Sequence, residues 1–313
     1  MSGYVVRRVL ATLPVMAMVA LIVFVMLRLT PGDPAAVLAG DMATPEQVAR
    51  IREAMGLQLP LHQQFFAWVW QLLHGDLGVS LLSQAPVADL IADRAGPSFA
   101  LAAGAITLSV LVAVPLGTLA AARRGSLLDR GVMAFSVLTF SVPVFLKGYV
   151  LIQLFSIDLG WLPVQGYRPL SAGAWEFAQR LVLPVVALSA AYTALIARIA
   201  RSSVLEVIGE DYIRTARAKG APERVVLLHH AVRNAAVPIL TVVGIGIAAL
   251  IGGVVVTESV FNIPGLGRLV VEAVLARDYP VIQGLILFFS FLYIGVNLVI
   301  DLLYTVLDPR IRY

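Results

Sequence analysis

Few charged or strongly polar side chains interrupt the apolar stretches of this sequence, and their types limit the chemistry that the chain can do. Lys147 lies four residues after Pro143, well inside an apolar stretch whose helix the proline should kink. A buried charge in such a setting is costly and usually faces a cavity or a partner. Lys147 therefore predicts either a cavity wall whose ammonium group meets an anion, or a cation that snorkels to the headgroups or pairs internally.

Three further polar residues lie within or at the end of apolar stretches. Asn297 and Asp301 are one helical turn apart near the end of the chain, where they favour hydrogen bonds between helices over contacts with a ligand. Glu258 ends another apolar stretch, and ordinary solvation at an outer mouth is expected for it. Lys147, Glu258 and Asn297 are the candidates for lining a pathway.

No motif for catalysis is present. The phosphate-binding Gly-x-x-x-x-Gly-Lys-Ser/Thr loop is missing, as are His-Glu-x-x-His and Gly-x-Ser-x-Gly. Cysteine is absent, which excludes disulfides and cysteine-ligated metals. The adjacent His229 and His230 would point about 100° apart on a helix, which favours solvation over a shared metal. We therefore expect a chain that is not an enzyme and that binds no metal or cofactor itself.

The amino-acid composition indicates whether the folded chain is surrounded by water or by lipid. Of 313 residues, 59% are hydrophobic and only 13% are charged, with a mean hydropathy of +0.89. Soluble domains have about 45–50% apolar and about 25% charged residues, so this chain cannot cover a water-facing surface. A membrane protein is predicted. The net charge of +4 is assigned to cytoplasmic loops rather than to nucleic-acid binding, because no basic helix lies outside the apolar framework.

Six apolar stretches are long enough to cross a bilayer as helices. The first is expected to be a retained helix rather than a signal peptide, because it is long and no small-residue cleavage site follows it. Glycines in the fifth stretch, Gly244, Gly246, Gly252 and Gly253, permit either close helix packing or the bending that a gate would use, and packing is the default interpretation. The six stretches are Val9–Leu29, Phe99–Ala122, Val132–Ile157, Leu181–Ile199, Val237–Thr257 and Val281–Val306.

The basic residues predict the orientation. If the amino terminus is inside, 14 of the 23 basic residues fall in cytoplasmic segments, and the short loops carry most of this bias. Both termini are therefore predicted to be cytoplasmic. The 14 residues are Arg7, Arg8, Arg123, Arg124, Arg130, Arg198, Arg201, Arg214, Arg217, Lys219, Arg224, Arg233, Arg310 and Arg312.

The outer segment Thr30–Ser98 is predicted to be helical, and with the first span it forms the first of two parts, 1–98 and 99–313. Thr44, Pro45 and Gln47 form a capping box that should start a helix ending near Gly56. A second helix, Leu61–His74, carries apolar residues at helical spacing. It predicts either a lid packed on the bundle or a helix at the headgroup boundary. The residues at this spacing are Phe66, Val69, Trp70 and Leu73.

The inner segment Arg201–Ala236 is the most charged part of the chain. Glu210 and Asp211 precede Arg217 and Lys219, the order that complements a helix dipole. Gly220 followed by Pro222 is a stop signal. A short amphipathic helix on the cytoplasmic face is predicted.

Two stretches resemble a known family. The first, Asp211-Tyr212-Ile213-Arg214-Thr215-Ala216-Arg217-Ala218-Lys219-Gly220, is similar to the coupling helix of bacterial ABC importer permeases. Only Ala216 and Gly220 match the general Glu-Ala-Ala signature and its following glycine. The departure is characteristic of the branch for peptides and nickel. The second stretch, Glu258–Arg268 continuing to Gln283, resembles the outer loop between the last two spans of this branch. Pro31–Pro34, Gly75–Gly78 and Asp308–Arg312 agree too.

The resemblance implies an all-α membrane protein with the type I ABC importer permease fold and six transmembrane helices. It implies the B-type pore-forming subunit of an importer for di- or oligopeptides, glutathione-like peptides or nickel complexes, in the bacterial inner membrane. Its partners would be a second permease, two cytoplasmic ATPases that bind ATP and Mg, and an extracytoplasmic solute-binding protein. Residues 211–220 would couple to the ATPases. Those facing the binding protein would be Asn262, Pro264, Gly265, Leu266, Gly267 and Arg268.

Two other functions compete with this interpretation. A secondary transporter would need ion-coordinating residues near the bilayer midplane and often has repeated halves, whereas only Lys147 offers support. An intramembrane enzyme would need a nucleophile–base pair or a metal set, and the sequence shows neither.

Overall fold

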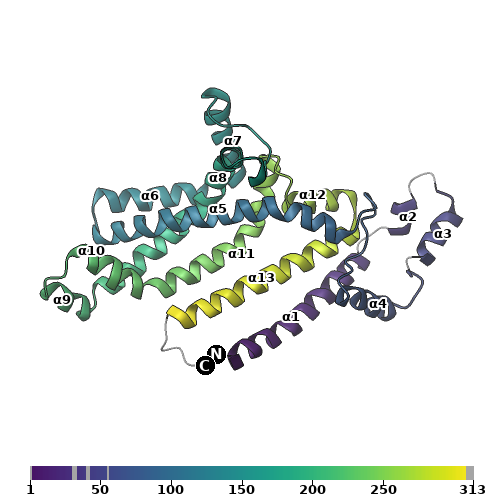
Figure 1. The fold of residues 1–313 in the computed structure, drawn as a ribbon, viewed down its shortest axis with the longest axis horizontal. Coiled ribbons are helices and arrows are strands. Elements are labelled where there is room, and N and C mark those ends of the chain that lie inside the picture. The colour runs from purple at the N-terminus through teal and green to yellow at the C-terminus, as the bar shows by residue number, and fades with distance from the viewer. Residues whose placement is uncertain (1, 30–33, 40–42, 55, 308–313) are drawn as a thin grey trace. The chain divides into compact units, whose positions relative to one another are not determined.

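The computed structural model describes residues 2–29, 34–39, 43–54 and 56–307, and this part of the chain is almost entirely helical (Figure 1). The motifs at 31–33 and 308–312 and residue Met55 lie outside the described residues. The elements are α1 (Ser2–Leu29), α2 (Pro34–Ala39), α3 (Pro45–Ala54), α4 (Leu61–Leu73), α5 (Val87–Ala122), α6 (Leu127–Ser141), α7 (Val144–Leu151), π-helix η1 (Ile152–Asp158), 3-10 turn η2 (Leu170–Ala172), α8 (Ala174–Ile208), α9 (Asp211–Ala218), α10 (Glu223–Val225), π-helix η3 (Val226–Val232), α11 (Ala236–Val260), α12 (Leu266–Ala276) and α13 (Tyr279–Leu307).

The apolar helices correspond to the predicted spans. Four described helices are long and apolar enough to cross a membrane: α5, α8, α11 and residues Tyr279–Leu303 of α13. The bent pair of α6 with Val144–Asp158 would be a fifth, and Leu10–Met26 of α1 is a shorter apolar helix. These segments occupy the six predicted stretches, and the all-α membrane fold is confirmed.

The chain forms two compact units, which we describe separately. Unit 1 contains Met1–Gly96 and Arg268–Gly295, and unit 2 contains Pro97–Gly267 and Val296–Tyr313. In unit 1 the predicted capping box is present, since Thr44 N–H donates to Gln47 Oε1 (2.8 Å) and Gln47 N–H donates to Thr44 Oγ1 (3.3 Å). Gly56 follows with φ +65°, as the predicted end of this helix requires.

The helix α5 is longer than its apolar stretch, because it begins at Val87 rather than near Phe99. Its first turns are held by packing within unit 1, where Val87 and Ile91 are buried and lie over Gly284. Pro97 stays inside the helix. Packing of apolar residues thus extends the helix through Pro97, well ahead of the predicted start at Phe99.

Pro143 breaks the third stretch instead of kinking it. The helix α6 ends at Ser141, Val142 is extended with ψ 126°, and α7 starts directly after the proline at an angle of 102°. A proline disfavours helical geometry at the residue before it, which explains the extended Val142. The prediction of one kinked helix is therefore corrected to two helices.

In unit 2 the backbones of α5 and α8 approach each other closely. A Cβ atom added at Gly117 of α5 would lie 2.5 Å from the carbonyl oxygen of Ala197 and 2.8 Å from Ala200 Cβ in α8. A buried cluster rich in alanine surrounds this contact. In lipid the hydrophobic effect does not drive helices together, so such van der Waals contact between small residues must hold them.

The glycines of α11 confirm the predicted close packing at two positions. A Cβ at Gly244 would meet Ile300 Cδ1 at 2.4 Å, and one at Gly253 would meet Leu188 at 2.7 Å. Gly252 differs, because nothing in the described structure lies within 4 Å of its added Cβ. The pattern identifies which glycines of the chain are needed for contact.

We expect Gly117→Ala to destabilise the protein by about 1–3 kcal/mol, since overpacking at a backbone contact forces α5 and α8 apart. Gly252→Ala is the matched control and should be neutral or slightly stabilising, because alanine favours helices and meets no neighbour. Thermal denaturation in detergent would measure both variants. Equal midpoints would contradict the proposed contact.

Candidate functional site

The helix α9 forms where the sequence predicts an amphipathic helix. Glu210 is its extended N-cap residue, Asp211 lies in its first turn and Arg217 in its last. The helix ends as predicted, since Gly220 has φ +78° and its N–H donates to the Arg217 carbonyl (2.9 Å). The N–H of Ala221 donates to Ala216 (3.2 Å), which completes a glycine C-cap.

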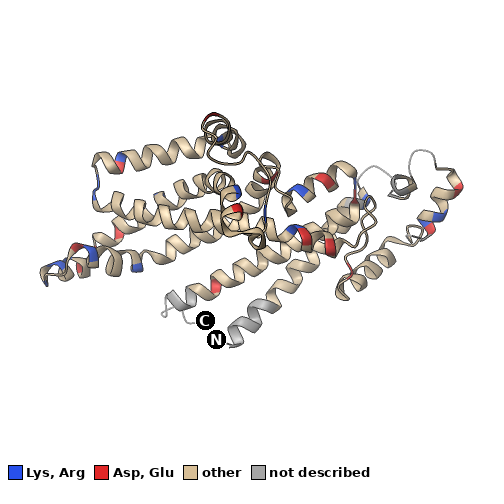
Figure 2. Ribbon diagram, turned by 45° about the horizontal axis from the view of Figure 1, so that its top comes forward, with Lys and Arg blue, Asp and Glu red and all other residues tan. Residues whose placement is uncertain are grey.

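One residue anchors α9 to unit 2 and leaves most of its surface in solvent. Ile213 is fully buried, and α9 contacts η3, where Val226 is also fully buried. The other side chains of α9 are exposed or half-buried, and the side chain of Arg214 is 75% exposed. Figure 2 shows charged residues gathered around α9 and α10. The helix therefore presents a charged surface that nothing else in unit 2 covers.

An ion pair fixes the turn after α9. Arg217 donates to Glu223 through Nη2 (2.7 Å) and Nε (3.2 Å). These bonds lower the pKa of Glu223 below its usual 4.5 and raise the pKa of Arg217. The stabilisation is present above pH 4.5 and is lost only as the pH falls through the lowered pKa. Because both side chains are largely exposed, water screens the pair and its contribution is small.

Tyr212 connects the start of α9 to the segment before α11. Partial burial and the charge of Glu210 raise the pKa of Tyr212, while a hydrogen bond with Asn234 opposes this effect. The phenol is therefore neutral at physiological pH. It gives α9 a second attachment, in addition to Ile213.

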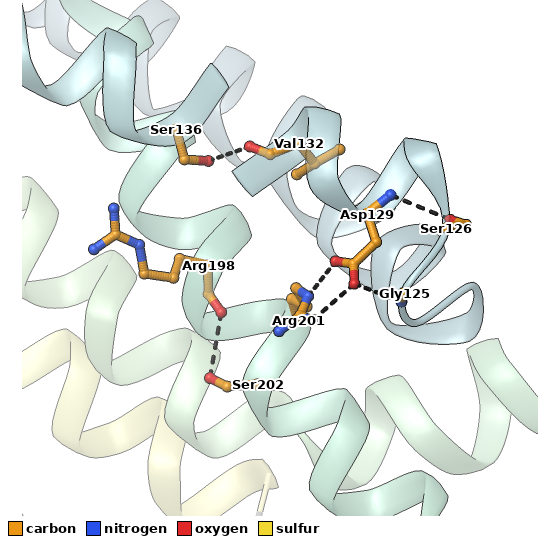
Figure 3. A network of polar contacts seen from close by, with 8 residues as sticks. All are labelled: Gly125, Ser126, Asp129, Val132, Ser136, Arg198, Arg201 and Ser202. Carbon is orange, nitrogen blue, oxygen red and sulfur yellow. Dashed lines mark hydrogen bonds and ion pairs between the residues drawn. The ribbon is translucent and has the colours of Figure 1, made fainter. Parts of the chain in front are cut away.

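A buried ion pair lies where α8 leads toward α9 (Figure 3). Arg201 of α8 donates to both oxygens of Asp129, with Nη2 2.8 Å from Oδ2, and the N–H of Gly125 donates to Oδ2 (2.9 Å). Asp129 is buried, and Ser126 caps its helix α6. Arg198, three residues earlier in α8, points away from this pair.

The Asp129–Arg201 pair joins α6 and the loop before it to the helix that carries α9. Neither residue was recognised as a partner of the other from the sequence, where Arg201 counted only as one of the cytoplasmic basic residues. The available signal was Gly125-Ser126 ahead of an aspartate, which is typical of a capped helix start.

Lys147 is paired within the chain. Its Nζ donates to the carbonyl oxygen of Thr139 (3.1 Å), across the break between α6 and α7. This is the internal pairing among the alternatives that the sequence left open. Asn297 is half-buried in α13.

Glu258 contradicts the expectation of ordinary solvation. It is fully buried, and Ser98 Oγ donates to its Oε1, while the N–H of Leu266 donates to Ser98 Oγ (2.7 Å). The chain after α11 folds back over this carboxylate. It can do so because a Cβ at Gly265 would lie 2.1 Å from Glu258 Oε1. The glycines that follow Pro264 were the signal that the sequence offered.

The predicted loop Asn262–Arg268 turns mostly inward. Gly265, Leu266 and Gly267 are buried, whereas Asn262 and Pro264 are exposed. Arg268 is half-buried and donates to Glu272 (2.7 Å). Within this loop, Asn262 and Pro264 are therefore the residues that unit 2 leaves exposed.

Comparison with known proteins gives consistent similarities. Residues 113–313 match the family described as binding-protein-dependent transport system inner membrane component, and residues 1–102 match its N-terminal family. The chain is 52% identical to a probable peptide ABC transporter permease protein of Sinorhizobium fredii. It is 45% identical to a putative peptide transport system permease protein of Brucella abortus, and 44% identical to the glutathione transport system permease protein GsiC of Salmonella choleraesuis. Each alignment covers 100% of both chains.

We expect Arg201→Gln to destabilise the protein by about 3 kcal/mol, because it leaves the buried Asp129 carboxylate without its arginine partner. Arg198→Gln, which removes an exposed arginine of the same helix, is the control and should change little. The double variant Asp129→Asn with Arg201→Gln should recover part of the loss, since no lone charge stays buried. Thermal midpoints in detergent would test this, and equal midpoints for the two single variants would contradict it.

Proposed function

Because this chain belongs to the family of binding-protein-dependent transport system inner membrane components, the permease subunits of ABC importers, we propose that it forms a peptide pathway and couples it to ATPases through α9. As a permease it is a multi-pass inner membrane protein. The pathway is shared with a second, homologous permease subunit, and two cytoplasmic ATPases bind ATP and Mg. The chain itself hydrolyses no nucleotide.

The substrate class follows from what the relatives are named for. Two of them are named for peptides and one for glutathione, which is itself a small peptide. The proposed substrates are therefore di- or oligopeptides, including glutathione-like peptides. Nickel complexes are the less supported alternative, since none of these three relatives is named for nickel.

The exposed surface of α9 carries the coupling proposal. One buried isoleucine fixes the helix to unit 2, and its charged residues remain available to a partner. Nucleotide shifts a transporter between two states only by its differential affinity for them. ATP binding closes the ATPase pair, the docked α9 moves with it, and the Asp129–Arg201 pair carries this motion to α6 and α8.

The orientation completes the proposal. Both termini and α9 are cytoplasmic, consistent with the basic bias of the short loops. Asn262 and Pro264, at the other end of α11 from η3, then face the extracytoplasmic side and contact the solute-binding protein there. Release of substrate from that protein is thereby tied to opening of the pathway.

The coupling surface can be tested by crosslinking, since the chain has no cysteine of its own. Arg214→Cys and Lys219→Cys should each be trapped against an ATPase in native membranes by a thiol-to-amine crosslinker. Arg168→Cys is the control, because it lies before α8, at the opposite end of that helix from α9. If neither α9 position is trapped, the coupling assignment is wrong.

Transport gives a second readout of the same surface. Arg217→Glu should reduce ATP-driven peptide uptake to background without preventing membrane insertion, and Gly220→Val should do the same because valine strains a positive φ. Normal uptake by both variants would remove the role of α9. Uptake by vesicles that contain no ATPase would instead favour an ion-driven secondary transporter.

The contact with the binding protein is tested at Pro264. Pro264→Glu should lower the ATP hydrolysis that the binding protein stimulates severalfold, while basal hydrolysis by the complex stays unchanged, because a charge is added only to an exposed position. Pro264→Ala adds no charge and serves as the control. Unchanged stimulation in Pro264→Glu would show that this loop does not contact the binding protein.

A further inference from the structure

Unit 1 contains a cavity between the C-terminal half of α1 and the segment from α3 to α4. Its volume is about 660 Å³, and its walls are mostly apolar. On one side lie Phe24 and Val25 of α1, and on the other Phe65 and Phe66 of α4. Neither the family nor the relatives' names assign a ligand to this place.

Aromatic contacts form the floor of the cavity. Phe24 is buried, and its ring centroid lies 5.3 Å from that of Phe65 and 5.8 Å from that of Trp68. Edge-to-face and tilted rings at such distances attract each other beyond their burial alone. The packed rings therefore hold α4 against α1, and this contact forms one side of the cavity.

The rim of the cavity is apolar and exposed. Phe66 is 67% exposed, and Val25 on the facing helix is 41% exposed. Trp70 and Leu73 continue the exposed apolar face along α4. Because Val25 belongs to a predicted membrane span, the surroundings of this rim are lipid acyl chains rather than water.

One end of the cavity is cationic. Arg28, in the last turn of α1, places its guanidinium 5.1 Å from the Phe24 ring centroid, and Arg52 of α3 lines the same cavity together with His62. Guanidinium groups bind phosphate through paired, charge-assisted hydrogen bonds. An apolar cavity with two arginines at the end of a membrane span is complementary to an amphiphile that carries a phosphate group.

We propose that this cavity binds a glycerophospholipid, with the phosphate between Arg28 and Arg52 and an acyl chain along Val25 and Phe66. The dimensions agree, because the seven helical steps from Leu21 to Arg28 rise about 10 Å along α1, enough for several methylene groups below the phosphate. In the proposed orientation the lipid belongs to the outer leaflet. Free phosphate is a poorer fit, since it would leave the apolar walls uncovered.

A bound lipid also accounts for the exposed face of α4. The sequence left open whether this helix is a lid on the bundle or a helix at the headgroup boundary. In unit 1 it is in contact with α1 through Phe65 and Trp68, and it exposes Phe66 and Trp70. A lipid in the cavity covers part of that exposed face and holds α4 at the depth of the headgroups.

The binding test uses the purified importer complex, depleted of lipid and titrated in mild detergent while native mass spectrometry counts bound molecules. Phosphatidylglycerol should bind, whereas diacylglycerol, which lacks the phosphate, and inorganic phosphate, which lacks the chains, should bind at least about tenfold more weakly. Equal binding of diacylglycerol would overturn the role of the arginines. Displacement of phosphatidylglycerol by inorganic phosphate at similar concentrations would show a site for a small anion instead.

Matched variants locate the lipid. Arg28→Gln with Arg52→Gln should weaken phosphatidylglycerol binding about tenfold, and Arg50→Gln, which removes an exposed arginine of the same helix α3 outside the cavity, should not. Equal weakening by Arg50→Gln would indicate only general attraction to positive charge and would overturn the proposal.

A second pair of variants keeps the charges and fills the space. Val25→Trp should exclude the acyl chain and lower lipid occupancy, whereas Met18→Trp, an exposed position of α1 outside the cavity, should leave it unchanged. Because both positions are exposed on α1, the complex is expected to assemble in each case. Full occupancy in Val25→Trp would place the lipid elsewhere.

Discussion

Unit 2 depends on the contact between α5 and α8 at Gly117. Water drives apolar helices together in soluble proteins, but in lipid the acyl chains are as apolar as the side chains. Helices are then held by shape, and a backbone approach that leaves no room for a Cβ provides many dispersion contacts. The alanines of α8 that face Gly117, and the glycines of α11 that face Leu188 and Ile300, follow from the same constraint.

Polar side chains complete this packing at both ends of the helices in unit 2. At one end Arg201 and Asp129 connect α8 to α6, and at the other Ser98 and Glu258 connect α5 to α11. The carboxylates of Asp129 and Glu258 thus each accept a hydrogen bond from within the chain, as burial requires. Each of these contacts fixes one helix against another through a defined pair of side chains.

Unit 1 uses different means. Its helix α4 meets α1 through aromatic rings, and the cationic end of the cavity beside this contact lies at the end of the first apolar stretch. Elsewhere in this unit Asp278 accepts hydrogen bonds from Ser80 and from the N–H of Leu81 and Leu82, which fixes the loop between α4 and α5. The segment between α1 and α5 is thus joined by polar hydrogen bonds and aromatic contacts.

The sequence by itself determined the membrane class, the apolar stretches, the capping box at Thr44 and the helix from Asp211 to its stop at Gly220. These depend on composition and on interactions within a few residues, which a sequence displays directly. Only the tertiary structure decided that Glu258 is buried, that Asp129 pairs with Arg201, and that Pro143 separates two helices at 102°. Whether a charged side chain meets water or a partner depends on residues far along the chain, 160 positions away for Glu258 and Ser98. The spacing of residues along the sequence does not show which distant residues come together in the folded protein.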